Sequence, residues 1–431
     1  MLFVYNFLQI ILVVILSPFL LAGTIFKVKY RGRILKRLGY GLAATAGQIR
    51  PGRVRIWIHA LSVGEVSSAR SLVAAVRAAF PEAVIIFSAT TQSGEELALN
   101  NLQNKVDCFV PFPLDFYWTV RKFISVLAPD LFLLVETDFW PNLLGIMHKR
   151  GTPIVLVNGR VSEDSFLMYR KFRPFFLPMF RSFSYLAMQS GVDKAKMIDL
   201  GLSPDRLMTP GNLKYEAVLP ENVAVGEMTT CRFIPQGKRV FIAGSTHAGE
   251  EEIVFGAYRR LRDKFPDLFL IVAPRNVERA NEVAVLAEEQ GLAVALRSKF
   301  SEVGSADLLL LDTLGELSLL YRFCDFAFIG GSLVRERGHN PLEASIFAKP
   351  VIFGPYMEDF VEVARDLLAA EGAVQVSGED DIFESGRRFL EDEIWRRNMG
   401  ERGQAMIEGQ RGVTARYIGL IATLIGKGGR G

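Results

Sequence analysis

The sequence predicts an α/β protein with two doubly wound, Rossmann-like domains facing a cleft, preceded by an N-terminal membrane helix. The chain has 431 residues, which is too long for one ordinary domain. Apolar strand-like runs alternate with amphipathic helix-like runs, and the same layout restarts at Arg239. Strands that are apolar throughout indicate parallel strands with both faces buried. In such units the loops at the carboxyl ends of the strands face the cleft.

The first element is the apolar run from Leu2 to Phe26, which we assign as a membrane anchor over residues 1–26. Its length matches the roughly 20 helical residues that cross about 30 Å of hydrocarbon. Positive charge follows the run and none precedes it, which argues against a secretory signal and keeps the next domain cytoplasmic. Because Asn6, Gln9 and Pro18 interrupt the run, a helix in the membrane interface is the alternative. Either arrangement would place the body at the inner, cytoplasmic face of a membrane.

The first Rossmann-like domain is expected over residues 27–212. Amphipathic helices separate four apolar runs that predict buried parallel strands, namely residues 54–60, 84–90, 130–136 and 153–158. Periodicity is lost between Gly211 and Gly237, where Pro, Gly and Asn gather, so the domain boundary is placed there.

The second domain is expected over residues 213–431. Its predicted strands are residues 240–245, 268–274 and 307–313. A shorter helix is predicted to start at Pro341 and to end before Pro350. The last predicted helix, residues 395–424, crosses back onto the first domain.

Net charge and the cysteine and histidine positions argue against several classes of protein. The net charge is only +3, which argues against a dedicated nucleic-acid-binding protein. The three cysteines lie far apart and form no CxxC pair, which is typical of a reducing compartment without disulfides or a zinc cage. The four histidines are scattered, so no metal site is expected.

The stretch FIGGSLVRERGHNPLE, residues 328–343, joins a strand end, a glycine pair and a helix start. In one interpretation it is a capping box: Asn340 caps the helix and Glu343 binds its own backbone. In the other it is a nucleotide site. There Gly330 and Gly331 admit a ligand, the helix N-terminus binds phosphate, and Glu343 accepts ribose hydroxyls.

Three further side chains are candidates for chemistry in the cleft. Glu65 follows a tight glycine turn at the end of a strand, and it either compensates a helix dipole or acts as a general base. Glu136 and Asp138 end a buried strand, where they either face solvent or reach the cleft. Lys214, between the domains, is either exposed charge or a group that meets an anionic substrate.

Nine motifs, in order, resemble those of one family. They are SVGE (62–65), ETDFWPN (136–142), NGRVSEDS (158–165), GNLK (211–214), AGSTHAGEE (243–251), APRNVER (273–279), DTLGEL (312–317), GGSLV (330–334) and GHNPLE (338–343). With the apolar N-terminus, the chain resembles the bacterial Kdo transferases, which move 3-deoxy-D-manno-octulosonic acid (Kdo) from CMP-Kdo to the lipid A precursor. The segments NGRVSEDS and VRERGHN depart slightly from the usual pattern, away from the candidate base.

The resemblance implies an inverting glycosyltransferase of the GT-B type that needs no metal and no cofactor besides its donor substrate. It makes Glu65 the base that deprotonates the acceptor hydroxyl, with Glu136 and Lys214 supporting the transition state. It places CMP-Kdo on the second domain, against Pro274, Arg275, Gly315, Glu316, Leu317, Asn340, Pro341, Leu342 and Glu343. Ser245 either joins this donor site or belongs to a helix cap.

The implied partners are CMP-Kdo, the tetraacyl disaccharide precursor of lipid A in lipopolysaccharide biosynthesis, and inner-membrane lipid. Two other classes share some of these features: a nucleotide-sugar epimerase of the same architecture, and a membrane-anchored nucleotide-binding protein without catalysis. In residues 166–183 cationic residues alternate with aromatic residues. The segment either lies against anionic lipid headgroups or forms a pair of core helices whose cationic side chains extend to solvent.

Overall fold

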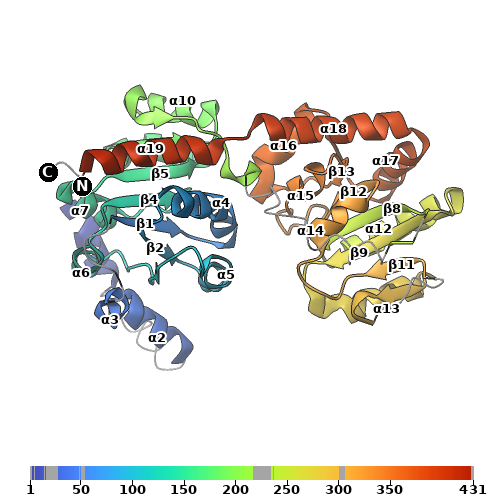
Figure 1. The fold of residues 1–431 in the computed structure, drawn as a ribbon, viewed down its shortest axis with the longest axis horizontal. Helices are drawn as coiled ribbons and strands as arrows, with labels where there is room; N and C mark the ends of the chain where they lie inside the picture. Colours follow the sequence, from blue (N-terminus) through green and yellow to red (C-terminus); the bar gives the residue numbers. More distant parts are fainter. Residues whose placement is uncertain are drawn as a thin grey trace. The chain divides into compact units, whose positions relative to one another are not determined.

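The computed structural model describes residues 2–3, 5–13, 15, 28–47, 49, 54–216, 234–235, 237–299 and 306–428. The chain divides into two compact units: unit 1 is Met1–Ala217 with Gly412–Gly431, and unit 2 is Val218–Arg411 (Figure 1). The boundary predicted from the sequence lies after residue 212. Within the described residues, each unit contains one seven-stranded sheet of parallel strands. The predicted α/β class with two Rossmann-like units is therefore confirmed.

The unit 1 sheet has the strand order β3-β2-β1-β4-β5-β6-β7. In that order the strands are Cys108–Phe109, Val84–Ala89, Arg55–Ala60, Leu131–Val135, Ile154–Gly159, Tyr185–Met188 and Leu207–Met208. Alternate residues of the central strands enter separate cores on the two faces. Trp57 and Phe132 lie in one core, and Ile58 and Leu133 lie in the other. Burial of both faces explains why these strands are apolar throughout.

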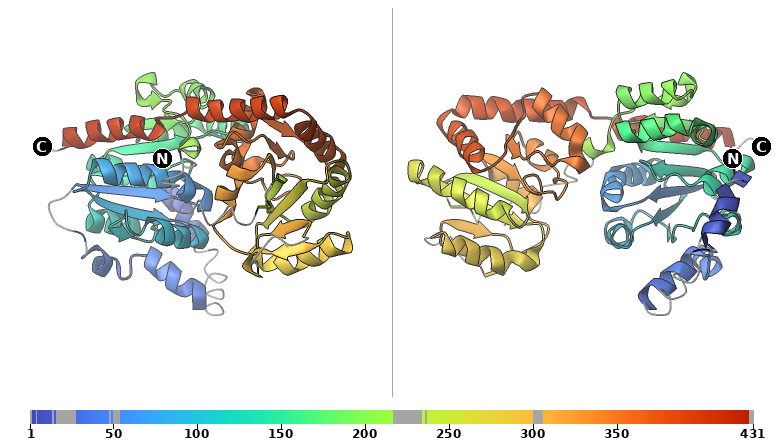
Figure 2. Two further views of the ribbon diagram at one scale, coloured as in Figure 1. Left: turned by 45° about the vertical axis from the view of Figure 1, so that its right-hand side comes forward. Right: turned by 180° about the vertical axis from the view of Figure 1, so that it is seen from behind.

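Helices cover both faces of this sheet (Figure 1; Figure 2). They are α2 Val28–Arg37, α3 Leu42–Ala46, α4 Val63–Ala79, α5 Gln92–Leu102, α6 Tyr117–Leu127, α7 Pro141–Arg150, α8 Glu163–Lys171, α9 Arg173–Phe180, α10 Gly191–Asp199 and α19 Val413–Gly428. The C-terminal helix α19 packs beside α4, and its residues Val413, Tyr417 and Ile421 join one core of unit 1. Glu216 fixes its start by accepting the Val413 N–H at 2.8 Å and the Thr414 hydroxyl at 3.0 Å.

The unit 2 sheet has the strand order β10-β11-β9-β8-β12-β13-β14. In that order the strands are Val294–Leu296, Leu308–Leu310, Leu268–Pro274, Arg239–Thr246, Phe326–Ile329, Val351–Phe353 and Ala373–Gln375. Its helices lie on both faces (Figure 2). They are α12 Glu250–Lys264, α13 Ala280–Glu289, α14 Leu317–Leu320, α15 Leu342–Ser345, α16 Val361–Ala369, α17 Glu379–Glu391 and α18 Glu393–Gly409.

Two predicted helices differ from those observed. The helix expected from Pro341 up to Pro350 is limited to α15, Leu342–Ser345. Soon after it, Ala348 adopts a positive φ of 55°, and its carbonyl packs so closely against Gly400 that a Cβ there would lie 1.9 Å away. The helix expected over residues 395–424 is two helices, α18 and α19, separated at Gly412, whose φ is 82°.

Only part of the predicted anchor is described. Residues 2–3, 5–13 and 15 are helical, and the remainder of the segment up to residue 26 lies outside the described residues. In the described part of the chain, no helix has both the length and the apolar character needed to cross a membrane. The side-chain amides of Asn6 and Asn142 pair reciprocally at 2.8 and 2.9 Å, and Gln9 donates to the Asp115 carbonyl at 3.3 Å.

The cationic, aromatic segment 166–183 forms α8 and α9 and has features of both interpretations. Phe166, Tyr169, Phe180 and Phe183 belong to a core of unit 1. Its cations and several apolar side chains are exposed at the surface, namely Leu167, Met168, Arg170, Lys171, Phe172, Arg173 and Arg181.

Candidate active site

Three carboxylates gather at the carboxyl end of the unit 1 sheet. Glu65 lies in the first turn of α4, soon after β1, and accepts the backbone N–H of Leu61. Glu65 is only 6% exposed, and burial is the main cause that raises its pKa to about 8. The charges of Glu136 and Asp138 raise this pKa further, whereas the Leu61 N–H and Lys214 lower it.

The three residues with predicted catalytic roles therefore share one electrostatic site. Glu136 directly follows β4 in a left-handed conformation, with a φ of 62°, and its N–H donates to the Val157 carbonyl at 2.8 Å. Lys214 lies in the short 3-10 helix Leu213–Tyr215, where its N–H donates to Asn212 Oδ1 at 3.0 Å. Both side chains shift the pKa of Glu65. Their catalytic roles stay a prediction.

The structure adds a buried histidine that sequence reasoning missed. His59, in β1, is fully buried, and its Nε2 lies 3.0 Å from Asp138 Oδ2. Its ring stacks on Phe112 at 3.5 Å between centroids, and burial lowers its pKa below the ordinary value. A neutral His59 therefore fixes the orientation of Asp138 beside Glu65. The only sequence signal was a histidine near the end of an apolar strand.

Two arginines of α2 also reach this edge of the sheet. Arg33 donates to the Thr90 carbonyl and forms an ion pair with Glu95 at 3.3 Å. Arg37 Nε donates to the Phe112 carbonyl at 2.9 Å, and burial followed by the Arg33 charge lowers its pKa. From the sequence, these cations indicated only the orientation of the chain at a membrane. Their positions add positive charge beside the carboxylates.

In unit 2, several predicted donor-site residues lie together at the carboxyl end of the sheet. Arg275 directly follows β9 and carries a charge that lowers the pKa values of both His339 and Glu343. Asn340 Oδ1 accepts the Leu342 N–H at 3.2 Å, and its amide lies 3.5 Å from the Glu343 carboxylate. Burial nevertheless raises the pKa of Glu343 above its ordinary value.

The other predicted donor-site residues occupy the same end of the sheet. Pro274 ends β9, and Ser245 lies near the end of β8 in a left-handed conformation with a φ of 57°. Gly315 has a φ of 87° just before α14. The carboxylate of Glu316 accepts Arg297 Nη2 at 2.7 Å, so this side chain already has a cationic partner within unit 2.

The glycine pair 330–331 makes close contacts within unit 2. A Cβ on Gly330 would lie 2.2 Å from the Ser245 carbonyl oxygen, so glycine is needed for close packing of the chain. The Gly331 and Leu333 N–H groups donate to the buried carboxylate of Glu250 at 2.7 and 2.9 Å. These contacts give the pair a structural role, and the interpretation that it admits a ligand stays a prediction.

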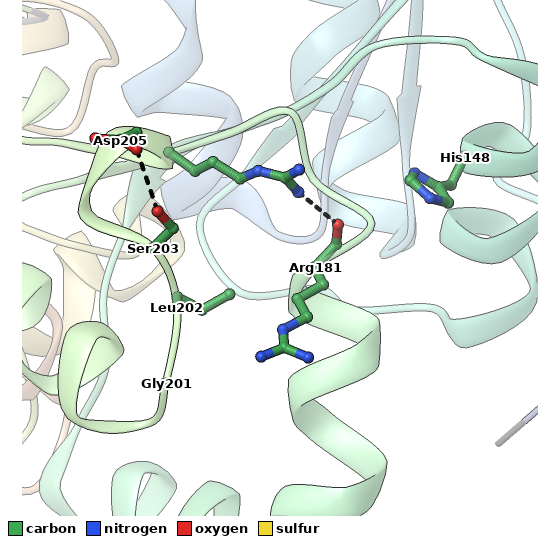
Figure 3. A pocket seen from close by; sticks show the side chains of 7 residues that line it. His148, Arg181, Gly201, Leu202, Ser203 and Asp205 are labelled. Atoms are coloured by element: carbon green, nitrogen blue, oxygen red, sulfur yellow. Dashed lines mark hydrogen bonds between the residues drawn. The ribbon is translucent and has the colours of Figure 1, made fainter.

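A separate surface hollow of about 770 Å³ lies in unit 1 (Figure 3). Its lining residues are His148, Arg181, Gly201, Leu202, Ser203, Asp205 and Arg206. The segment 201–206 leads into β7, and Arg181 precedes β6. Because these segments enter parallel strands, the hollow lies at the amino end of the sheet, away from Glu65. Across the described residues, no group of three or more His, Cys, Asp or Glu side chains is placed to hold a metal ion.

Comparison with known proteins identifies the family. Residues 32–217 match the family model of 3-deoxy-D-manno-octulosonic-acid transferase (kdotransferase). A 3-deoxy-D-manno-octulosonic acid transferase of Haemophilus influenzae is 33% identical over 398 residues, which cover 91% of each chain. The chain belongs to the Kdo transferase family. A Kdo transferase of Bordetella pertussis is 30% identical, over 86% of this chain and 87% of the relative. This membership makes the chain a glycosyltransferase.

Solved structures agree with the Kdo transferase fold described above. A glycosyltransferase from Rickettsia africae gives a TM-score of 0.58 at 12% identity, covering 87% of this chain and 99% of the other. A UDP-GlcNAc 2-epimerase from Neisseria meningitidis gives the same TM-score at 12% identity, over 84% and 100%. At such identities the likeness concerns the fold alone, which is the GT-B type. Transferases and epimerases share this fold, so function is argued from the site.

Proposed function

We propose that this Kdo transferase moves Kdo from CMP-Kdo to the tetraacyl disaccharide precursor of lipid A, with inversion at the anomeric carbon. The observation that carries the proposal is the buried Glu65, whose pKa of about 8 suits a base at neutral to mildly alkaline pH. A carboxylate with this pKa is a stronger proton acceptor than an ordinary glutamate. Family membership supports transfer of Kdo.

The reaction we propose is a single displacement. The acceptor hydroxyl attacks the anomeric carbon of Kdo and gives its proton to the Glu65 carboxylate. The bond between this carbon and the CMP phosphate oxygen breaks, and the electron pair leaves with CMP. In unit 2, the Arg275 guanidinium is suited to bind the phosphate or the Kdo carboxylate, and Glu343 accepts ribose hydroxyls. Lys214 balances negative charge near the base.

We also propose that the protein lies at the cytoplasmic face of the inner membrane. The support comes from the N-terminal helix, which uses Asn6 and Gln9 to contact unit 1. Its large apolar side chains are exposed instead, at Phe3, Phe7, Leu8, Ile10, Ile11, Leu12 and Ile15. An apolar face directed away from the body favours a helix lying in the membrane interface.

The transfer is tested with purified protein in detergent, CMP-Kdo and the tetraacyl precursor, with mass spectrometry of the lipid. A mass increase of one or more Kdo units is expected, and it disappears in Glu65→Gln. Glu163→Gln is the matched control, because Glu163 also lies in the first turn of a helix but is exposed. If the two variants transfer Kdo equally well, Glu65 only compensates a helix dipole and is not the base.

Membrane binding is tested by flotation with vesicles of anionic phospholipid. Replacing Phe7, Leu8 and Ile11 together with serine is expected to abolish flotation while transfer to detergent-solubilised acceptor persists. Serine at the exposed surface residues Leu99, Val285 and Ile394 is the control, since it removes similar apolar area elsewhere. Unchanged flotation of the first variant would contradict the proposed role of this helix.

A further inference from the structure

Asn158 has an unusual conformation for a fully buried residue. It lies near the end of β5, is 0% exposed, and has a φ of 58°. A left-handed conformation is uncommon for a residue with a side chain, although asparagine tolerates it better than most. Such residues concentrate at functional sites, where the surrounding structure holds them in place. Asn158 lies one strand away from Glu136, which is also left-handed.

The side-chain amide of Asn158 joins Glu136 to the segment that carries Lys214. Its Nδ2 donates to Glu136 Oε1 at 3.3 Å. Its Oδ1 accepts the N–H of Leu213, the residue before Lys214, at 2.9 Å. The amide nitrogen of Asn158 therefore binds the Glu136 carboxylate, and the amide oxygen binds the backbone next to Lys214. Asparagine can make both bonds because its planar amide carries a hydrogen-bond donor and an acceptor side by side.

A second hydrogen-bonded route connects the backbone of Asn158 to the same segment. The Asn158 carbonyl accepts Gln189 Nε2 at 3.0 Å, and Gln189 Oε1 accepts Asn212 Nδ2 at 3.2 Å. Asn212 in turn accepts the Lys214 N–H. The Asn158 N–H donates to the hydroxyl of Tyr417, in α19, at 2.8 Å. All of these side chains lie within unit 1 and are buried, so their hydrogen bonds are shielded from water.

We propose that Asn158 is a positioning residue, which fixes the Glu136 carboxylate relative to the Lys214 segment. It acts through these two groups and does not itself contact the substrate. The inference rests on the proposed function, in which Glu136 and Lys214 support the transition state beside Glu65. Loss of the side chain therefore lowers turnover without weakening donor binding, because the predicted CMP-Kdo residues belong to unit 2.

The first test is Asn158→Gly. Glycine accepts the positive φ and keeps the backbone bonds to Tyr417 and Gln189, so only the two side-chain hydrogen bonds are lost. We expect kcat to fall about 10- to 100-fold with an unchanged KM for CMP-Kdo, as for loss of a bond to a charged group. The control is Glu371→Gly, which changes an exposed left-handed residue of unit 2 and is expected to leave kcat unchanged.

The second test, Asn158→Asp, replaces the amide donor with a carboxylate of the same shape. A negative charge beside Glu136 raises the pKa of Glu65, so the rising limb of the kcat profile moves to higher pH. A purely structural residue changes the amount of folded enzyme and leaves this limb in place. If both folded variants keep kcat within about twofold of wild type and show the wild-type pH profile, the proposal is overturned.

A double substitution separates this inference from the proposed function. If Asn158 acts partly through Glu136, Asn158→Gly lowers kcat less in a Glu136→Gln background than in wild type. Fully additive losses would show that Asn158 does not act through Glu136. If wild-type protein transfers no Kdo, the proposed function itself is wrong. If it does and neither Glu65→Gln nor Glu136→Gln lowers turnover, only the catalytic roles proposed for these carboxylates are wrong, whatever the Asn158 variants do.

Discussion

The pH dependence of turnover follows from the raised pKa of Glu65. Burial, together with the charges of Glu136 and Asp138, raises this pKa to about 8. Only the carboxylate accepts a proton, so the active fraction is about one in ten at pH 7 and about nine in ten at pH 9. The rate of transfer should therefore rise about tenfold per unit well below pH 8, about fivefold from pH 7 to 8, and level off above it. Glu65→Gln should lose at least about a hundredfold at the plateau.

The same pKa shift has a cost in stability. The folded state holds the Glu65 proton more tightly than an ordinary glutamate with a pKa of 4.5, because the folded pKa is about 8. The free energy of unfolding therefore falls as the pH rises from 4.5 towards 8. The shift sets a ceiling of about 5 kcal/mol on this loss. Glu65→Gln cannot ionise, so it should be more stable than wild type at pH 9 while being nearly inactive.

Both effects are measured on the same two proteins. Initial rates of Kdo transfer are recorded between about pH 6 and 9. This range contains the rising part of the pH–rate profile that a base with a pKa of about 8 produces. Urea unfolding is followed at both ends of this range. A wild-type rate that stays flat across the range would refute the assignment of Glu65 as the base. A Gln variant less stable than wild type at pH 9 would instead show that the carboxylate contributes favourable contacts in the folded state.

Three further predictions follow from neighbouring contacts. Lys214→Met removes a charge that lowers the pKa of Glu65. The rising limb of the pH–rate profile should therefore move above pH 8, and kcat should fall. A limb that does not move would contradict this coupling between Lys214 and Glu65. Arg275→Gln should weaken CMP binding about tenfold in calorimetry, as for loss of a hydrogen bond between charged groups, with the urea midpoint unchanged. Gly330→Ala should lower the free energy of unfolding by about 1–3 kcal/mol, since its Cβ meets the Ser245 carbonyl. If Gly330→Ala instead loses only CMP affinity, the glycine serves the ligand.

The fold was predictable where strands are long and buried on both faces. The strand predicted at residues 54–60 corresponds to β1, Arg55–Ala60, and the strand predicted at residues 130–136 corresponds to β4, Leu131–Val135. An unbroken apolar run of this length is typical of a parallel strand that is buried on both faces. The edge strands β3 and β7 were missed, since two residues carry no periodicity. Helix α15 was predicted too long because contacts with α18, which are remote in sequence, end it early.

The site was predictable only in part, because motifs identify residues but not their partners. Glu65 and Glu136 were identified at strand ends and Lys214 in the segment between the domains, and the structure places all three in one electrostatic site. The pairing of His59 with Asp138 depends on how β1 is placed beside β4, which no single segment encodes. The role of Asn158 depends likewise on segments far apart in the chain, since its partners include Leu213 and Tyr417.

The cluster of carboxylates around Glu65 makes physical sense as a compromise between basicity and stability. An isolated, solvated glutamate is ionised at neutral pH but is a weak proton acceptor. Burial beside Glu136 and Asp138 strengthens the base, yet each increment of pKa reduces the ionised fraction and destabilises the folded state. Lys214 and the Leu61 N–H oppose the increase, which keeps the pKa close to the pH at which a base is most effective. Weakening either set of contacts should therefore move the optimum pH before it abolishes transfer.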